Sequence, residues 1–167
     1  GSPIKRLEDS RLLIGKGTFV DDISRVNLLH AVMLRSPISH GFIKSIDTTA
    51  AESMPGVHSV ITASDLGDNI PVVPLRLMPM EELEPLGQPV IAQKKVRYVG
   101  EVVALVLADN PARAEDALSA IKFDIDPLEA VSSCSDSISG RSLLFANSIN
   151  NKAITYRATK GDISPAF

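Results

Sequence analysis

The clearest pattern of apolar and polar positions lies between residues 96 and 126. Six consecutive apolar residues at 102–107 are rich in β-branched types and too few to span a membrane, which predicts a strand covered on both faces. Asn110 then offers a helix N-cap and Pro111 suits the first helical position. One helical stripe follows, at Ala114, Ala117, Leu118 and Ile121. Residues 121–125 alternate apolar with polar, which predicts a half-exposed strand and so a strand–helix–strand unit long enough for a βαβ crossover.

Shorter patterns on both sides of this unit predict further strands and helical turns. The predicted strands are residues 28–34 (buried), 42–46, 57–61 and 90–92, with an edge strand at 153–158, and the predicted helical turns are 11–14, 49–54 and 62–66. Asp9 or Ser10 precedes the first turn as a candidate N-cap, and Asp47 or Thr48 precedes the second. The sequence therefore predicts an α+β fold: a mixed β-sheet with a few short helices, built around the core unit 96–126.

Residues 67–90 interrupt these patterns with five prolines, which prevent regular structure. The segment carries several apolar side chains, at Leu75, Leu77, Met78, Met80 and Leu83. A long irregular segment inside a domain is usually functional or mobile, and exposed apolar side chains mark interaction surfaces. Two interpretations are equally compatible with the sequence: a surface that meets another domain, or a loop folded onto its own core.

A shift in composition after residue 131 predicts a domain boundary. Residues 132–137 are rich in serine and poor in apolar side chains, which is typical of a linker, and residues 143–145 (Leu-Leu-Phe) form a small apolar anchor. We therefore expect a domain at 3–131, followed at 132–167 by a partly flexible linker and the start of the next domain. Residues 1–2 have the appearance of an expression-tag scar, outside the native domain.

Composition narrows the range of possible functions. Hydrophobic residues make up 44% of the chain, and the net charge of −3 gives no electrostatic basis for binding nucleic acid. The basic residues 94–97 are expected to be a solvated strand end. Cys134 is the single cysteine, so neither a disulfide framework nor a cysteine metal site is expected, and its serine-rich surroundings suggest an exposed thiol. With no apolar run of spanning length and no visible signal peptide, a reducing, cytoplasmic compartment is expected.

The sequence offers no convincing catalytic, cofactor-binding or metal-binding residue. Residues 15–18 (Gly-Lys-Gly-Thr) lack the first glycine of a phosphate loop and the serine or threonine after its lysine, so a turn is expected. Asp21 and Asp22 lack the further oxygen ligands that a Ca²⁺ site needs, which favours a solvated turn. The three histidines, at 30, 40 and 58, share no metal-binding spacing, and a structural role is expected for His30.

Several fragments, in this order and spacing, resemble the start of a molybdenum hydroxylase large subunit. The fragments are residues 6–13 (RLEDSRLL), Gly17 with 19–22 (FVDD), 29–31 (LHA), 35–37 (RSP) with His40 and Ile43, Asp47, 55–57 (PGV), 62–66 (TASDL), 96–101 (VRYVGE) and Pro111-Ala112. The resemblance covers roughly residues 5–162. It is nearest to the bacterial carbon monoxide dehydrogenase type, in a family that also contains aldehyde oxidases and xanthine dehydrogenases. Ser10 and Val102 stand where this family often has proline, and residues 67–86 follow no family pattern.

The resemblance implies the N-terminal α/β hammerhead domain of a longer enzyme. In such enzymes the molybdopterin cofactor, the catalytic residue and the substrate pocket belong to later domains, so the fragment itself is expected to be inactive. The implied partners are the molybdopterin-binding domain of the same chain and subunits that carry flavin and iron–sulfur clusters, with neither nucleic acid nor a membrane span. Carbon monoxide, an aldehyde and a purine all remain possible substrates. The alternative is a free-standing, non-enzymatic binding or assembly module.

Overall fold

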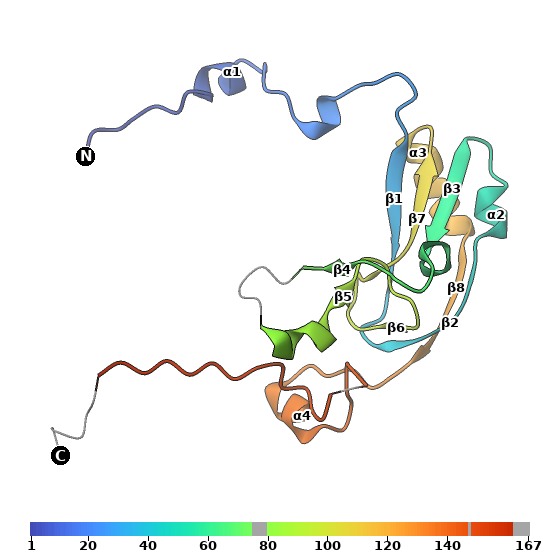
Figure 1. Cartoon of the computed structure of the whole chain (residues 1–167). Coiled ribbons are helices and arrows are strands. Elements are labelled where there is room, and N and C mark those ends of the chain that lie inside the picture. Colours follow the sequence, from blue (N-terminus) through green and yellow to red (C-terminus); the bar gives the residue numbers. More distant parts are fainter. Residues whose placement is uncertain (75–79, 147, 162–167) are drawn as a thin grey trace.

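The computed structural model describes residues 1–74, 80–146 and 148–161, and its body contains two three-stranded antiparallel sheets. The first sheet has the strand order β1-β7-β3, so that the apolar strand β7 lies in the middle (Figure 1). These strands are β1 (His30–Arg35), β7 (Val102–Ala108) and β3 (Val57–Thr62). Both edges of β7 are paired, and the face that carries Ala104, Val106 and Ala108 is buried. Leu105 and Leu107 on the other face are half-buried and belong to neither core, so the predicted cover on both faces is found on one face only.

The second sheet has the order β6-β2-β8. It consists of β6 (Lys95–Val96), β2 (Gly41–Asp47) and β8 (Lys122–Pro127). A two-stranded sheet of β4 (Val72–Val73) and β5 (Gln88–Pro89) lies within the proline-rich segment. Inward apolar and outward charged side chains alternate along β8, as the sequence predicted for a half-exposed strand.

Helix α3 (Pro111–Ala120) begins as the sequence predicted. The side chain of Asn110 accepts a hydrogen bond from the backbone N–H of Arg113 at 2.9 Å, and Pro111 occupies the first turn. The strand–helix–strand unit is confirmed, but the expectation of a βαβ crossover within one sheet is wrong. Both edges of β7 are already paired, with β1 and with β3, so the chain leaving α3 pairs antiparallel with β2 instead.

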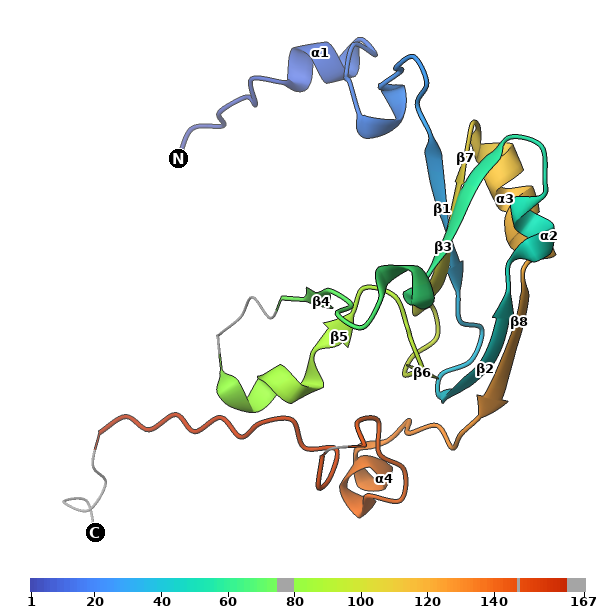
Figure 2. The ribbon, with the colours of Figure 1, turned by 45° about the vertical axis from the view of Figure 1, so that its right-hand side comes forward.

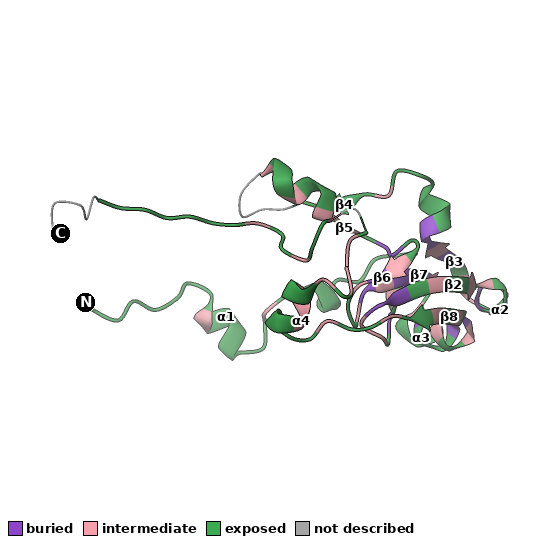
Figure 3. Cartoon of the chain, turned by 90° about the horizontal axis from the view of Figure 1, so that it is seen from below, coloured by how far each residue is buried: buried purple, intermediate pink, exposed green. Residues whose placement is uncertain are grey.

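Two small cores hold these layers together (Figure 3). The larger lies between α3 and the first sheet, where Ala104 and Ala108 of β7 meet Ala114 and Ala117 of α3, all four fully buried. Alanine on both surfaces allows the helix to lie close to the sheet. The smaller core groups Ala92, Val96 and Val103 beneath the second sheet.

Strand β1 differs from its prediction. Residues 28–34 were expected to form a strand buried on both faces, yet β1 alternates half-buried with exposed positions, and Met33 is 44% exposed. The reason is that α3 covers only one face of the sheet, the face that carries Val32 and Leu34. The run of apolar residues is therefore real, but half of it has no covering layer within the described chain.

Short helices lie close to the predicted positions 11–14, 49–54 and 62–66, and three more form at 20–22, 81–86 and 134–139, where the sequence predicted no helix. They are α1 (Asp9–Leu13), η1 (Val20–Asp22), α2 (Thr49–Glu52), η2 (Ala63–Leu66), η3 (Glu81–Leu86) and α4 (Cys134–Ser139). Thr62 and Asp65 form a capping box at η2, and the Asp47 carboxylate accepts a hydrogen bond from the Thr49 N–H at 3.1 Å near the start of α2. The predicted cap of α1 is wrong, because the N-cap position falls on Glu8, which makes no side-chain capping bond.

Three predictions in the second half of the chain need correction. Residues 90–92 form no strand. Ala92 is instead buried in the smaller core, where its N–H donates a single hydrogen bond to the Val102 carbonyl at 2.7 Å. Residues 153–158 are extended without a strand partner. The serine-rich linker contains helix α4, since the Ser133 hydroxyl accepts a hydrogen bond from the Asp136 N–H at 3.1 Å and caps it. Leu75, Leu77 and Met78 lie outside the described residues.

The two ends of the chain extend away from the body on the same side. The N-terminal arm, residues 1–29, and the C-terminal segment, residues 152–161, both lie on the side away from α3 (Figure 2). Apolar side chains of the arm are open to solvent, with Leu7 fully exposed and Val26 92% exposed.

Candidate functional site

The structure concentrates its long-range polar contacts where residues 128–153 fold back onto the second sheet. Lys95 donates from Nζ to the Leu143 carbonyl at 2.9 Å, and Arg97 donates from Nε to the Leu144 carbonyl at 3.2 Å. The Arg97 guanidinium carbon also lies 4.7 Å from the ring centroid of Phe145, which is cation–π geometry. We call these contacts the linker anchor. They hold residues 143–145, the predicted apolar anchor, by two backbone carbonyls and one aromatic ring.

The linker anchor corrects the prediction for the basic residues. Lys94 is exposed, as expected of a solvated strand end, but Lys95 and Arg97 are half-buried. Strand β6 pairs with β2 at Lys95 and Val96, which fixes the two basic side chains beside the chain carbonyls at 143 and 144. Those carbonyls have no secondary-structure partner, so a cationic donor stabilises them.

His40 lies at the inner end of the same region and is 2% exposed. Its Nδ1 is 2.9 Å from the Glu129 carbonyl and 3.3 Å from the Ser142 hydroxyl, which itself donates to the Glu129 carbonyl at 2.9 Å. Burial lowers the pKa of His40, the hydrogen bond to Glu129 opposes that shift, and the charges of Lys95 and Arg97 lower the pKa further. A neutral ring donating from Nδ1 to the carbonyl therefore fits this position best.

Asn151 ties the far end of this segment to its beginning. Its side-chain oxygen accepts a hydrogen bond from the Leu144 N–H at 3.1 Å, and its amide donates to the Ser142 carbonyl at 2.7 Å. The segment is therefore a folded loop and not an open tether.

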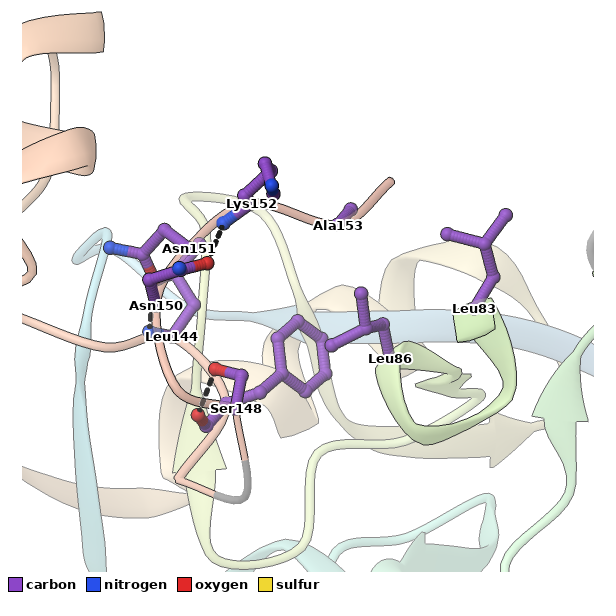
Figure 4. Close-up of a pocket in the computed structure, with 9 residues that line it drawn as sticks. Leu83, Leu86, Leu144, Ser148, Asn150, Asn151, Lys152 and Ala153 are labelled. Carbon is purple, nitrogen blue, oxygen red and sulfur yellow. Dashed lines mark hydrogen bonds between the residues drawn. The ribbon is translucent and has the colours of Figure 1, made fainter. Parts of the chain in front are cut away.

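A pocket of about 330 Å³ opens between this loop and η3 (Figure 4). Leu83 and Leu86 of η3 form one wall, Leu144 lies across the pocket from Leu83, and Phe145 also lines the pocket. Lys152 contributes the only ionisable side chain among the residues that line the pocket. Its chemistry suits an apolar side chain of a protein partner better than a charged cofactor.

Glu101 is the most deeply buried ionisable group in the described chain, at 1% exposed. One carboxylate oxygen accepts the Arg97 backbone N–H, and the other has no hydrogen-bond partner among the described residues. Burial raises the pKa of Glu101, while the hydrogen bond and charge of Arg97 act in the opposite direction. The burial of Glu101 and His40 was not predicted from the sequence; the signal for Glu101 is an acidic residue directly before the apolar run 102–107.

The remaining candidate residues have structural positions. Gly15 ends α1 with a φ of +70°, and the Asp22 carboxylate accepts the Phe19 N–H at 2.9 Å, which confirms the two turns. Cys134 is exposed, as expected, at the first position of α4. Within residues 1–74, 80–146 and 148–161, no group of three or more His, Cys, Asp and Glu side chains could hold a metal ion. In the same ranges, every helix is too short or too polar to cross a membrane.

Comparison with known proteins places this geometry in context. A family model described as "Aldehyde oxidase and xanthine dehydrogenase, a/b hammerhead domain" matches residues 14–129. Over its whole length, the chain is 39% identical to the nicotine 6-hydroxylase large subunit of Paenarthrobacter nicotinovorans, and the match covers 20% of that subunit. The chain superimposes on 21% of quinoline 2-oxidoreductase from Pseudomonas putida 86 with a TM-score of 0.79, at 30% identity over the whole chain. The superposition on the Cu,Mo-CO dehydrogenase in its carbon monoxide reduced state has a TM-score of 0.72 at 32% identity. It covers 89% of this chain and 18% of the dehydrogenase chain.

The chain therefore spans about a fifth of the length of these relatives. The small antiparallel sheets, the few short helices and the family match together confirm the α/β hammerhead expected from the resemblance. The chain belongs to the aldehyde oxidase and xanthine dehydrogenase family, and its residues 14–129 match the a/b hammerhead domain of that family.

Proposed function

We propose that this chain is the non-catalytic N-terminal domain of the large subunit of a molybdenum-dependent oxidoreductase. One observation carries the proposal: the entire chain aligns with only a fifth of a much longer enzyme subunit. The domain would support the catalytic part of that subunit by packing against it. The free-standing module is not favoured, because the relatives contain this domain within a longer chain.

Molybdenum is named for one relative, the Cu,Mo-CO dehydrogenase. The residues described here do not fit such a group: they offer no cluster of metal ligands, and the pocket beside η3 has an apolar wall with a single lysine. We therefore place the molybdopterin cofactor in the remainder of the subunit and assign no reaction step to residues of this chain.

The substrate would also be selected outside this domain. Relatives named for nicotine, quinoline and carbon monoxide have similar sequence identity to the chain, at 39%, 30% and 32%. Three chemically unlike substrates at comparable identity argue that the hammerhead domain does not encode the choice among them. We propose oxidation of a small molecule and leave the choice among carbon monoxide, an aldehyde, a purine and an N-heterocycle to the catalytic part.

Three further proposals concern organisation. The hammerhead domain would occupy residues 3–131 and the next domain would begin within 132–167, which the end of the family match at residue 129 supports. The partners would be the molybdopterin-binding part of the same chain and subunits with flavin and iron–sulfur clusters. The proline-rich segment 67–90 would contribute to that contact, since η3 supplies one wall of the apolar pocket. A cytoplasmic location is supported by the exposed, unpaired Cys134.

The test is made on the complete large subunit, purified with the subunits that accompany it. We expect molybdenum to be present by elemental analysis and a dye to be reduced with at least one substrate among carbon monoxide, nicotine, quinoline, aldehydes and xanthine. A complete subunit without molybdenum and without activity toward any of them would contradict the proposed function.

A further inference from the structure

We propose that the uncovered face of the β1-β7-β3 sheet is the surface on which the downstream part of the same large subunit packs. This inference rests on the proposed function and names the surface that would perform it. We call the surface the open face; its residues are Ala31, Met33, Ser59, Ile61, Leu105 and Leu107.

The register of the sheet places these six residues on one side. Leu105 pairs with Met33 of β1 and with Ile61 of β3, which forms one row across three strands. Leu107 pairs with Ala31 and with Ser59, which forms a second row. Residues directly opposite each other in antiparallel strands point to the same face, so both rows lie together. The alternate positions, including Val32, Val106 and Val60, point toward α3 and form the larger core.

No other part of the described chain covers the open face, and its side chains are less polar than those of a sheet surface that faces water. None of its six residues belongs to either core, and Met33 is 44% exposed. Strand β8 provides an internal comparison: its outward positions are Lys122, Asp124 and Asp126, all exposed. An antiparallel sheet that faces water on one side normally shows the pattern of β8. Arg35 of β1 bounds this face at one end, where its guanidinium donates to the Met33 sulfur at 3.4 Å. The five apolar residues and one serine beyond it indicate a face that a partner covers.

The position of the chain ends indicates which partner that is. The N-terminal arm and the C-terminal segment both leave the body on the side away from α3, which is the side of the open face (Figure 2). About four-fifths of the nicotine 6-hydroxylase large subunit lies outside the part that this chain matches. A segment linked covalently at that side has a high effective concentration beside the open face, so it would occupy the face ahead of any separate molecule. The exposed apolar side chains of the arm, such as Leu7 and Val26, would close over the same partner.

Met33 gives a direct reporter, because peroxide converts an accessible thioether to a sulfoxide that mass spectrometry detects. We expect Met33 to be oxidised readily in the 167-residue chain and to be protected in the complete large subunit. Equal oxidation of Met33 in both would overturn the proposal. Protection in the 167-residue chain that increases with protein concentration would also overturn it, since a second copy would then be the occupant.

A matched pair of substitutions tests the surface itself. Ala31 on the open face and Ala112 on α3 are both exposed alanines, so Ala31→Asp and Ala112→Asp add the same charge to opposite sides of the domain. In the complete subunit, an unpaired carboxylate buried against an apolar partner should shift the docking equilibrium by about a hundredfold. Ala31→Asp should therefore restore Met33 oxidation to the level of the 167-residue chain, while Ala112→Asp should leave Met33 protected. Protection that survives Ala31→Asp, or that is lost equally in both variants, would overturn the assignment of the face.

Molybdenum content, measured on the same samples, separates this inference from the proposed function. Protected Met33 in a subunit that holds no molybdenum would retain the docking surface and contradict the enzyme class. Accessible Met33 in a subunit with full molybdenum would retain the enzyme class and overturn the docking surface.

Discussion

Replacing Arg97 by alanine should loosen the folded loop at 142–153 without unfolding the domain. The substitution removes the hydrogen bond to the Leu144 carbonyl at 3.2 Å and the contact with the Phe145 ring at 4.7 Å. A charged hydrogen bond contributes about 1.5–3 kcal/mol and a partly exposed cation–π contact about 0.5–1 kcal/mol. Burial and, after it, the charge of Arg97 lower the pKa of Lys95, and relief of that repulsion offsets part of this sum. We expect a net loss of about 1–2 kcal/mol, and 1.4 kcal/mol is about tenfold in a local opening equilibrium.

The assay is native-state amide exchange across residues 142–153, with Lys94→Ala as the matched control. Lys94 belongs to the same basic cluster but is exposed, and the hydrogen bond that its backbone carbonyl accepts from the Ile43 N–H at 3.0 Å survives the substitution. Exchange in the loop should be about tenfold faster in Arg97→Ala and unchanged in Lys94→Ala. Equal exchange rates in the two variants would show that the Arg97 side chain does not hold the loop, and the reasoning would be refuted.

Three further predictions concern the body of the domain and its linker. Gly100→Val should lower the free energy of unfolding by about 1–3 kcal/mol through backbone strain alone, because Gly100 has a φ of +92° and open space around a Cβ; equal thermal midpoints for the variant and the wild type would disprove this. Burial raises the pKa of Glu101, so its contribution to stability is present below the unfolded pKa and is lost as pH rises through the folded pKa. Glu101→Gln should remove that loss. Urea unfolding at a series of pH values from acidic to neutral tests this, and a free energy of unfolding that falls equally with pH in both proteins would count against it. Limited proteolysis should cut within residues 132–141 before it cuts within 96–126, and first cuts inside the strand–helix–strand unit would contradict the architecture.

The elements of the strand–helix–strand unit were predictable because their signals are local. Asn110 accepts a hydrogen bond from the N–H three residues ahead and caps the helix that begins at Pro111, a residue that suits only the first turn. The apolar run at 102–107 is typical of a central strand. The pairing of these strands was not predictable from the same signals. Whether β7 and β8 share a sheet depends on competition with β1, β2 and β3 for the strand edges, which no short window contains.

In the candidate site, too, local features were predictable from the sequence and contacts between distant segments were not. The apolar character of residues 143–145 was visible in the sequence, but the contact of Phe145 with Arg97 spans 48 positions and arises only in the folded chain. His40 resembles any loop histidine until Glu129 and Ser142 fold over it. Burial of a polar side chain is set by segments distant in sequence, so its residue type alone does not reveal it.

The central claim is that this domain supports a molybdenum enzyme without holding its chemistry. The most direct measurement compares molybdenum content and dye reduction in the isolated 167-residue chain with those of the complete large subunit in its native complex. The account predicts molybdenum and turnover in the complete subunit, and neither above background in the isolated chain. Stoichiometric molybdenum or substrate-dependent dye reduction in the isolated chain would contradict it.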